Sequence, residues 1–349
     1  MDKDLKNKTL SELEQLVIDL GQKKYQAKYI FSFIHSLDAL DISQITPLAK
    51  DFRKQLTDNG FYISKLNTVE TFNDPDGTVK YLFELPDGYR IETVLLSDDQ
   101  RKTLCVSTQV GCVMNCVFCA TGKLKFRRNL TAAEIVDQVN TVQSKDSKIS
   151  NVVFMGMGEP MENYDSVIKA VRILNHPQGK NIGIRHLTVS TCGIIPGILK
   201  LAQEDIHLRL AISLNAPTNV LRSKLMPINK KYPLEKLLKA VSTYQNKTEL
   251  RVTFEYILID GLNDTVLYAQ MLARMLRGYK CNINLIEYNP HRATSNQRPA
   301  TTFAASDRTA MKRFAAVLEN VGIETTIRLK KGQQINAACG QLGADLLNI

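Results

Sequence analysis

Three cysteines, Cys112, Cys116 and Cys119, lie within eight residues of the chain. Their Cys-x3-Cys-x2-Cys spacing puts three thiolates on one loop, where they can hold three irons of a cubane iron–sulfur cluster. The fourth iron then stays open for another ligand, which indicates chemistry rather than electron storage. A zinc site is the alternative, but it needs a fourth Cys or His close by. No histidine lies within 50 residues of the loop, the nearest being His176, so the pattern favours a cluster.

A second motif lies at the end of a predicted strand and reads Met155-Gly156-Met157-Gly158-Glu159-Pro160. Glycine lets the backbone come close to a ligand, and a glutamate accepts hydrogen bonds from a cationic group. Such a segment is also typical of an ordinary turn after a strand. Its distance from the cysteines fits a second part of the same site.

The composition predicts a globular protein with an anionic partner. The 349 residues are 44% hydrophobic and 23% charged, and 45 Lys and Arg against 35 Asp and Glu leave a net charge of +10. A chain of this length can bury one large core or two unequal ones. The cationic excess suggests nucleic acid, because Lys and Arg bind phosphates with release of counterions.

Seven cysteines are too few for a disulfide scaffold, so the clustered thiols indicate metal binding or catalysis in a reducing compartment. The sequence has no run of about 18 apolar residues, and its charged N-terminus does not resemble a signal peptide. We therefore expect a cytoplasmic protein with no membrane partner.

From about residue 100 the sequence alternates short β segments with helices. The predicted strands are 103–108, 151–156, 185–191, 208–214, 251–258 and 282–288, and helices are predicted at 132–142, 164–174, 234–244 and 266–276. Six such repeats favour an α/β fold with a parallel sheet, either open or curled into a partial (βα)6 barrel. The chemistry should then gather at the carboxyl ends of the strands.

The flanking regions have other patterns. The N-terminal part reads as helical, with a capping box formed by Thr9 and Glu12. A tight turn at Pro86-Asp87-Gly88 predicts a β-hairpin. We expect four units: a small helical domain at 1–75, a hairpin extension at 76–100, the barrel at 101–305, and at 306–349 a helix (306–320), a strand (324–329) and a tail.

The cysteine spacing, with an aromatic residue before the last cysteine, resembles the radical S-adenosylmethionine (SAM) enzymes. Within that superfamily, the chain is similar to the RNA adenine methyltransferases of the RlmN and Cfr type. The similarity rests on six segments in order: CVSTQVGC (105–112), FCATG (118–122), RNLT (128–131), FMGMGEP (154–160), KLMPIN (224–229) and AACGQL (337–342).

The resemblance implies a radical-SAM barrel with two cofactors. A 4Fe-4S cluster would be held by the three loop cysteines, and SAM would chelate the open iron. The SAM contacts implied are Gly158, Glu159, Ser190, Ser213, Leu214, Asn215 and Asn289. The electron donor would be a flavodoxin- or ferredoxin-like protein.

The resemblance also implies a mechanism. Adenine C2 and C8 are electron-poor and do not attack a sulfonium methyl, so Cys339 would first take a methyl group from one SAM. A second SAM would generate the radical that activates this S-methyl group for addition to the base. Glu92 would accept the ring proton, and Cys105 would release the product by forming a transient disulfide with Cys339.

Four residues depart from the family pattern. Asn215 stands where relatives usually carry His, and Lys125 stands where they usually carry Gly. Gln334 and Asn336 are amides at two tail positions where Asp is expected. These changes affect local hydrogen bonds near Cys339 rather than the reaction class.

The predicted partners are 23S rRNA and tRNA, bound by a chain that we expect to be a monomer. A basic cluster follows the cysteine loop and is a candidate for phosphate binding: Lys123, Lys125, Arg127 and Arg128. The N-terminal helical domain could supply a second RNA contact, as the resemblance implies.

Two alternatives remain at this point. The preferred activity is methylation of C2 of adenosine, in 23S rRNA and beside the anticodon in tRNA. The first alternative is Cfr-type methylation of C8 of the same rRNA adenosine, which confers antibiotic resistance. The second is a non-catalytic iron–sulfur protein that binds RNA, which would not need Cys105, Cys339 and Glu92 together.

Overall fold

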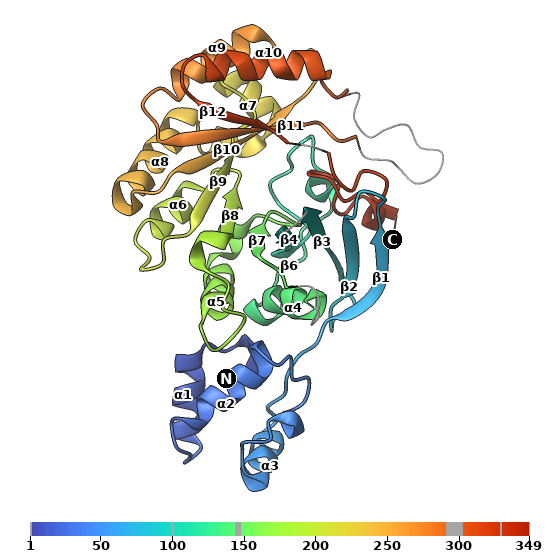
Figure 1. Cartoon of the computed structure of the whole chain (residues 1–349), viewed down its shortest axis with the longest axis vertical. Coiled ribbons are helices and arrows are strands. Elements are labelled where there is room, and N and C mark those ends of the chain that lie inside the picture. The colour runs from blue at the N-terminus through green and yellow to red at the C-terminus, as the bar shows by residue number, and fades with distance from the viewer. Residues whose placement is uncertain (1, 99–100, 144–147, 291–302, 329, 349) are drawn as a thin grey trace.

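The computed structural model describes residues 2–98, 101–143, 148–290, 303–328 and 330–348. Within these residues, ten strands form one sheet in the order β1-β2-β3-β4-β7-β8-β9-β10-β11-β12 (Figure 1). Parallel pairing joins β4 (Arg101–Cys105), β7 (Asn151–Phe154), β8 (Leu187–Thr191), β9 (Arg209–Ser213), β10 (Val252–Leu258), β11 (Cys281–Glu287) and β12 (Glu324–Ile327). The predicted α/β fold with six parallel barrel strands is confirmed.

Helices follow the parallel strands on the outer side of the sheet (Figure 1). They are α4 (Ala132–Val142), α5 (Tyr164–Asn175), α6 (Ile195–Leu201), α7 (Asn219–Leu225), α8 (Leu234–Thr248), α9 (Val266–Met275) and α10 (Arg308–Glu319). The four predicted barrel helices and the last helix are confirmed, whereas the seven-residue helices α6 and α7 were not anticipated. No helix of the described chain is long and apolar enough to cross a membrane.

An antiparallel meander extends the sheet at one edge. It consists of β1 (Asn67–Asn73), β2 (Val79–Glu84) and β3 (Arg90–Asp98), and β3 pairs antiparallel with β4. The predicted hairpin is therefore continuous with the barrel sheet. β1 was not predicted because most of its residues are exposed, so the strand lacks an alternation of apolar and polar side chains.

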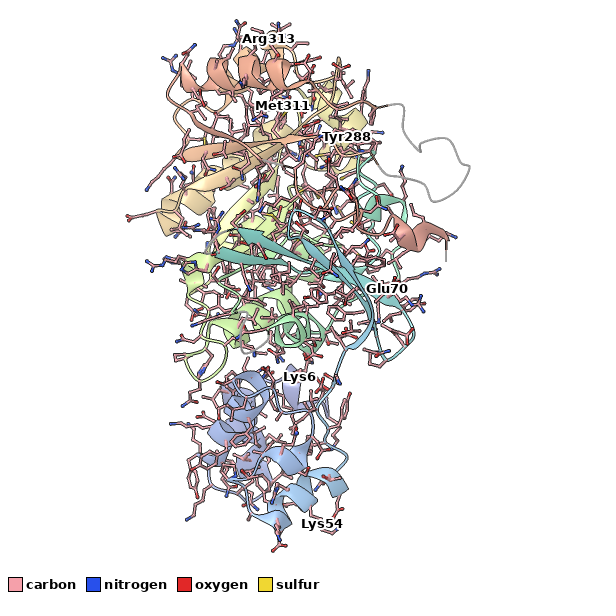
Figure 2. All side chains as sticks on the ribbon, turned by 45° about the vertical axis from the view of Figure 1, so that its right-hand side comes forward. Lys6, Lys54, Glu70, Tyr288, Met311 and Arg313 are labelled. Atoms are coloured by element: carbon pink, nitrogen blue, oxygen red, sulfur yellow. The ribbon has the colours of Figure 1, made fainter. Side chains whose placement is uncertain are left out.

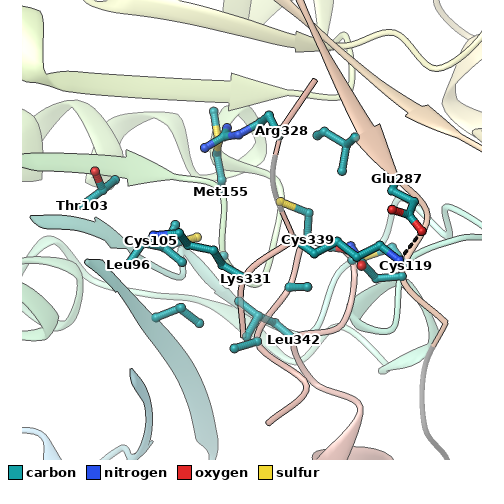
Figure 3. A pocket seen from close by; sticks show the side chains of 18 of the residues that line it. Leu96, Thr103, Cys105, Cys119, Met155, Glu287, Arg328, Lys331, Cys339 and Leu342 are labelled. Atoms are coloured by element: carbon teal, nitrogen blue, oxygen red, sulfur yellow. Dashed lines mark hydrogen bonds and ion pairs between the residues drawn. The ribbon is translucent and has the colours of Figure 1, made fainter. Parts of the chain in front are cut away.

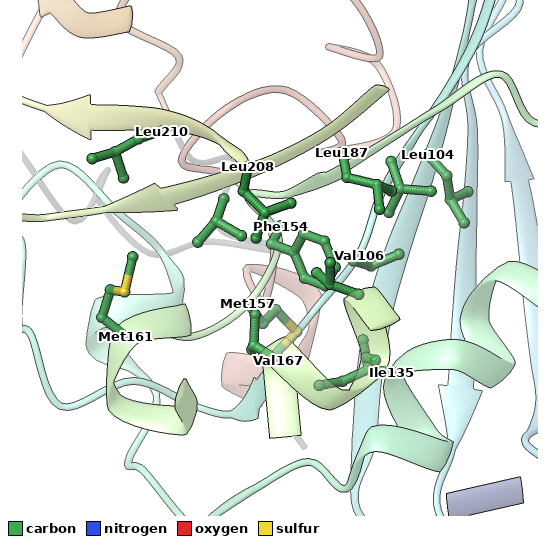
Figure 4. Close-up of a cluster of buried hydrophobic side chains, with 14 of the residues drawn as sticks. Leu104, Val106, Ile135, Phe154, Met157, Met161, Val167, Leu187, Leu208 and Leu210 are labelled. Atoms are coloured by element: carbon green, nitrogen blue, oxygen red, sulfur yellow. The ribbon is translucent and has the colours of Figure 1, made fainter. Parts of the chain in front are cut away.

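The barrel strands present one face to the helices and the other to the interior. In β7, Val152 and Phe154 are buried in the apolar cluster with side chains such as Leu104 and Val167 (Figure 4). The alternate residue Val153 faces a cavity inside the sheet. Because side chains alternate along a strand, each strand contributes to both the core and the interior.

The N-terminal region packs beneath the barrel as three helices, α1 (Leu10–Asp19), α2 (Gln26–His35) and α3 (Lys50–Asp58). The predicted capping box of Thr9 and Glu12 is present at the start of α1. Lys6, at the junction seen in Figure 2, forms a buried ion pair with Asp137 of α4. The other oxygen of Asp137 accepts a hydrogen bond of 2.6 Å from the Leu66 amide, which ties the two regions together.

The C-terminal tail, defined as residues 330–348, returns from β12 to lie beside the meander (Figure 1). The Gly332 amide donates a hydrogen bond to Asp76 at 2.7 Å, and the Gln334 amide donates one to Asp74 at 3.0 Å. Both acceptors lie in the turn between β1 and β2. The tail therefore crosses from one edge of the sheet to the other and covers its interior.

Candidate active site

A cavity of about 420 Å³ lies inside the sheet, under the tail. Its lining includes Cys105 from β4, Cys119 from the cysteine loop and Cys339 from the tail. Figure 3 shows the Cys105 and Cys339 side chains in this one space, with Arg328 and Met155 beside them. The tertiary structure therefore brings together three thiols that are separated by up to 234 residues in the sequence.

The cysteine loop, defined as residues 111–119, follows the short strand β5 (Gln109–Val110). Gly111 has φ +74°, and a Cβ atom there would lie 2.2 Å from the Lys125 carbonyl oxygen, so this position requires glycine. Asn115 adopts a left-handed conformation, and the Cys119 amide donates a hydrogen bond to the Cys116 carbonyl at 3.2 Å. These turns curl the loop so that its thiols neighbour one another.

Two of the loop thiols, Cys112 and Cys116, resist ionisation. Burial raises the pKa of Cys112 to about 12 and raises that of Cys116 well above its ordinary value, and neighbouring thiols add to both effects. A bound metal deprotonates coordinating thiols outright. No three His, Cys, Asp or Glu side chains in the described chain converge to hold a single metal ion. A cubane instead offers each thiolate a separate iron, so three neighbouring thiols fit a 4Fe-4S cluster.

The glycine motif after β7 packs tightly against β5. A Cβ atom on Gly158, which has φ +101°, would lie 2.5 Å from the Gln109 Cβ atom. Glu159 is buried, and its carboxylate accepts hydrogen bonds from the amides of Cys192 at 2.8 Å and Met161 at 3.0 Å. Burial raises the pKa of Glu159, and these hydrogen bonds oppose that rise. Its predicted contact with SAM stays a prediction and would use the remaining lone pairs.

The other predicted SAM contacts lie at strand ends. Ser190 is the second-last residue of β8. Ser213 is the last residue of β9, and Leu214 follows it. Asn215 is buried with φ +62°, and its side-chain oxygen accepts a hydrogen bond of 2.8 Å from the Ile257 amide. Asn tolerates this left-handed conformation better than most residues, as does the His that the family resemblance led us to expect at this position.

Sequence reasoning missed Arg222 of α7, which is fully buried beside these strand ends. Its guanidinium donates to the carbonyls of Leu214 at 3.0 Å and Cys192 at 2.6 Å, and to the Asn229 side chain at 3.0 Å. It thereby holds the ends of β8 and β9 in place. The only signal was its position two residues before the matching segment 224–229.

The tail is held beside the end of the cysteine loop through backbone carbonyls that follow Cys339. The Ala120 amide donates to the Gly340 carbonyl at 2.7 Å, and the Thr121 hydroxyl donates to the Leu342 carbonyl at 2.6 Å. The Asn289 side chain donates to the Cys339 carbonyl at 3.3 Å, so this predicted SAM contact binds the tail in the structure. Cys339 itself lines the cavity.

Cys105 and Cys339 are close enough to influence each other's ionisation. Burial raises the pKa of Cys105 to about 12, and the Cys339 thiol adds to this rise. Burial also raises the pKa of Cys339, and the Arg328 cation opposes the rise at both thiols. The disulfide predicted between them is not formed here, since both sulfurs are free thiols.

Glu92 of β3 lies outside the cavity lining, beneath the tail. It is buried, with one carboxylate oxygen 3.0 Å from the Lys80 ammonium and the other accepting a 2.7 Å hydrogen bond from the Gly343 amide. Burial raises the pKa of Glu92, and the Lys80 charge opposes this rise. Lys80 is also buried and forms a second ion pair, of 2.5 Å, with Asp345.

The departure at Asn336 fits this network. Its side-chain amide donates a 2.9 Å hydrogen bond to Asp345, and its backbone is left-handed with φ +52°. An aspartate here would set a second carboxylate against Asp345, whereas the amide supplies a donor. At Gln334 the backbone amide, rather than the side chain, makes the contact with Asp74.

The basic cluster after the loop divides into two parts. The guanidinium of Arg128 binds Glu134 with two hydrogen bonds of 2.8 Å and Asp87 at 2.5 Å, so it is used within the protein. Lys123, Lys125 and Arg127 are exposed. Arg127 lies over the ring of Tyr89, 5.9 Å from its centroid, which places an aromatic face among these cations.

Comparisons with known proteins agree with this geometry. Residues 106–268 match the model of the radical SAM superfamily, and residues 3–61 match that of the ribosomal RNA large subunit methyltransferase N-terminal domain. A crystal structure of a radical SAM methyltransferase from Sphaerobacter thermophilus superposes with a TM-score of 0.90 at 42% identity, covering 98% of this chain and 100% of the other. The fold and the cysteine loop thus define a radical SAM enzyme, a class that uses a 4Fe-4S cluster and SAM.

Two curated relatives narrow the assignment. A probable dual-specificity RNA methyltransferase RlmN from Geobacillus kaustophilus is 46% identical over 340 residues, 96% of this chain and 91% of that protein. The protein of the same description from Staphylococcus carnosus is 44% identical over 337 residues, 95% and 90% of the two chains. The chain belongs to the RlmN family of radical SAM methyltransferases, as the sequence resemblance predicted.

Proposed function

We propose that this protein methylates C2 of a specific adenosine in 23S rRNA and of the adenosine beside the anticodon in tRNAs. The observation that carries the proposal is the single cavity lined by Cys339, Cys105 and Cys119. A methyl-accepting thiol, a resolving thiol and a cluster ligand can act on one base only if they share one space. The descriptions of the curated relatives as dual-specificity RNA methyltransferases support the choice of substrate.

The cofactors would be held by the residues at the carboxyl end of the barrel. Cys112, Cys116 and Cys119 would bind three irons, and SAM would be contacted by Gly158, Glu159, Ser190, Ser213, Leu214, Asn215 and Asn289. When bound, these groups supply the methyl group, the electron and the deoxyadenosyl radical that removes a hydrogen atom from methylated Cys339, at a cost of two SAM per product. A flavodoxin- or ferredoxin-like protein is the proposed electron donor.

Cys339 carries the methyl group because the electron-poor C2 carbon cannot take it directly from a sulfonium. The thiol must ionise to act as a nucleophile, and the Arg328 cation favours that ionised form. After methylation and hydrogen removal, the carbon on the Cys339 sulfur bonds to C2 and joins protein and RNA covalently.

Glu92 and Cys105 complete the turnover. Glu92 accepts the proton from the ring carbon, which requires its carboxylate to be ionised. As this proton leaves, the adduct also gives up one electron, which would return to the cluster. The Cys105 thiolate then attacks the Cys339 sulfur, the sulfur–methylene bond breaks with its electron pair on the carbon, that carbon takes up a proton to become the methyl group, and a Cys105–Cys339 disulfide remains. Because the Gly343 amide covers Glu92 in the described state, the tail must shift at this contact before Glu92 reaches a base.

RNA would approach across the loop that follows the cysteines. The exposed cations Lys123, Lys125 and Arg127 suit phosphate groups, and the exposed rings of Tyr89 and Phe126 offer stacking surfaces beside them. The N-terminal helices are a proposed second contact with RNA. We expect the enzyme to act as a monomer in the cytoplasm, where both RNAs are found.

Nucleoside mass spectrometry tests this proposal. An unmodified 23S rRNA fragment and unmodified tRNA would each be incubated anaerobically with cluster-loaded protein, SAM and a reductant. The expected product is 2-methyladenosine, and the RNA that contains it defines the substrate range. A product of 8-methyladenosine would instead assign the Cfr-type reaction. SAM cleavage with no methylated adenosine would overturn the proposal.

A further inference from the structure

A second cavity, of about 530 Å³, opens at the amino ends of the barrel strands. Its lining is polar, with threonines and asparagines from β4, β7, β8, β10 and β11 facing inward. Five arginines surround it: Arg101, Arg185, Arg209, Arg251 and Arg328. Of the residues in the catalytic proposal, only Arg328 lies in this lining.

The arginines leave this cavity strongly cationic. Arg101 pairs with Asp98, and Arg251 pairs with Glu324, at the exposed rim. In the described chain Arg185, Arg209 and Arg328 have no carboxylate within 4.0 Å, and all three are exposed. Unpaired guanidinium groups around a concave surface attract anions, because the low-dielectric walls focus their field.

The lining contains one acidic side chain among the described residues, Glu255 of β10. It is only 6% exposed, and one carboxylate oxygen accepts a 2.9 Å hydrogen bond from the Asn284 side chain. Its other oxygen has no hydrogen-bond partner in the described chain. A ligand that occupies the cavity therefore meets a buried acceptor for an ammonium or hydroxyl group, beneath a rim of cations.

The cationic cavity continues into the thiol cavity. Five residues line both spaces: Arg101, Thr103, Met155, Thr326 and Arg328. Arg101, Thr103 and Cys105 alternate along the inner face of β4, so the rim and the resolving thiol are about 13 Å apart along the strand. The two cavities therefore adjoin along β4, on the side of Cys105 away from the proposed RNA surface.

We infer that this passage admits a small anionic thiol, which reduces the Cys105–Cys339 disulfide after each turnover; the inference rests on the proposed function. A thiol is required because the passage ends at a disulfide. A small molecule is required because the barrel interior is too narrow for a folded reductase. Two or more carboxylates match the arginine rim, and an amino group matches Glu255.

The chemistry consists of two thiol–disulfide exchanges. The thiolate of the entering molecule attacks the Cys105 sulfur, forming a mixed disulfide and releasing the Cys339 thiolate beside Arg328. A second thiolate attacks the sulfur of the first molecule, which leaves as a symmetrical disulfide and frees Cys105. The protein disulfide gains two electrons, and two small thiols lose one electron each.

The test measures reduction rates of the oxidised protein. Cluster-loaded full-length protein would be oxidised with diamide, and the Cys105–Cys339 disulfide identified by non-reducing peptide mass spectrometry. Its reduction by glutathione (anionic), 2-mercaptoethanol (neutral) and cysteamine (cationic) would be compared at equal thiolate concentration. We expect glutathione to exceed cysteamine by about tenfold or more at low salt, and the preference to fall as salt is added.

The double variant Arg185→Gln/Arg209→Gln removes two rim charges that take no part in the proposed catalysis. We expect its glutathione to cysteamine ratio to approach one. Arg277→Gln/Arg313→Gln, an equal charge change at the turn after α9 and on α10, should keep the wild-type ratio. A ratio that is unchanged in the rim variant overturns the passage but not the methyltransferase proposal. Failure of the oxidised protein to form the disulfide overturns both.

Discussion

The cysteine loop and the C-terminal tail both present thiols to one cavity, but they are held in different ways. The loop is shaped by its own turns, with Gly111 and Asn115 in left-handed conformations and a hydrogen bond from Cys119 to Cys116. The tail is held by hydrogen bonds to distant residues: Asp76 and Glu92 of the meander, and Thr121 after the cysteine loop. The proposed metal site is thus shaped within a short segment, whereas the proposed methyl-accepting thiol is placed by contacts from distant parts of the fold.

The largest expected effect comes from the loop itself. Cys112→Ala removes one of the three proposed cluster ligands, and we expect loss of bound iron and of all RNA methylation, because each of the three thiolates would bind its own iron of the cubane. Iron and sulfide analysis with nucleoside mass spectrometry measures this. Cys281→Ala, a change of the same kind in β11 outside both cavities, should keep the cluster and the activity. Equal losses in the two variants would refute the ligand assignment.

The tail thiol is tested through its partner on β4. Cys105→Ala should lose turnover and be isolated covalently joined to RNA through Cys339, because the adduct forms and cannot be resolved. Denaturing gels with nuclease treatment, followed by peptide mass spectrometry, detect the adduct. The Cys105→Ala/Cys339→Ala double variant should carry no RNA. Recovery of RNA-free Cys105→Ala protein from cells that load the cluster would contradict the proposed roles.

The ion pairs beneath the tail should contribute strongly to stability. Lys80→Met leaves the buried Glu92 carboxylate without its cation, and we expect the free energy of unfolding to fall by about 3–5 kcal/mol. Urea denaturation measures this. Lys54→Met, which breaks an exposed pair with Asp58, should change stability by less than about 1 kcal/mol. If both variants lost the same amount, the tail network would not be a stabilising contact.

Two glycine substitutions compare how rigidly the cysteine loop and the tail are held. Gly111→Ala forces a Cβ atom to within 2.2 Å of a backbone oxygen at a left-handed position, and we expect a loss of about 2–4 kcal/mol. Gly340→Ala is also left-handed, but its Cβ atom would lie 3.1 Å from the Phe118 oxygen, so about 1–2 kcal/mol is expected. Thermal or urea unfolding of the two variants measures which one loses more free energy of unfolding. A larger loss in Gly340→Ala would show that the tail is the more rigid region.

The smallest effect concerns the pH dependence of methylation. In its proposed role Glu92 would accept a proton only as a carboxylate, and burial raises its pKa, so the rate should rise with pH through a value above the ordinary pKa of a glutamate. The nearby Asp345 charge raises this pKa further, so Asp345→Asn should move the acid limb to lower pH. Single-turnover rates against pH measure the shift. A limb that moves to higher pH would contradict Glu92 as the proton acceptor.

Much of the architecture could be predicted from sequence because its signals are local. The strand–helix alternation predicted the parallel barrel strands, and the capping box of Thr9 and Glu12 predicted the start of α1. β1 was not predicted because its residues are mostly exposed. The helices α6 and α7 were not predicted because each has only seven residues. A periodic pattern needs one buried face and enough length to be recognised.

Part of the candidate site depended on contacts that no pattern shows. In the sequence, Arg128 cannot be distinguished from its basic neighbours. In the structure, its guanidinium binds the carboxylates of Asp87 and Glu134. Arg222 is fully buried at the ends of β8 and β9, although nothing in its local sequence distinguishes it from a surface arginine. Such roles follow from which distant groups surround a side chain.

The sequence by itself determined the chemistry of the cysteine loop and the repeat that builds the barrel, because spacing within a loop and periodicity within a helix or strand are local properties. Only the tertiary structure decided that Cys339 meets Cys105 in one cavity, that Glu92 lies under the tail with Lys80, and that five arginines surround the other end of the barrel. These arrangements arise when separate strands align in register and a tail is held across them by hydrogen bonds to residues more than 200 positions away.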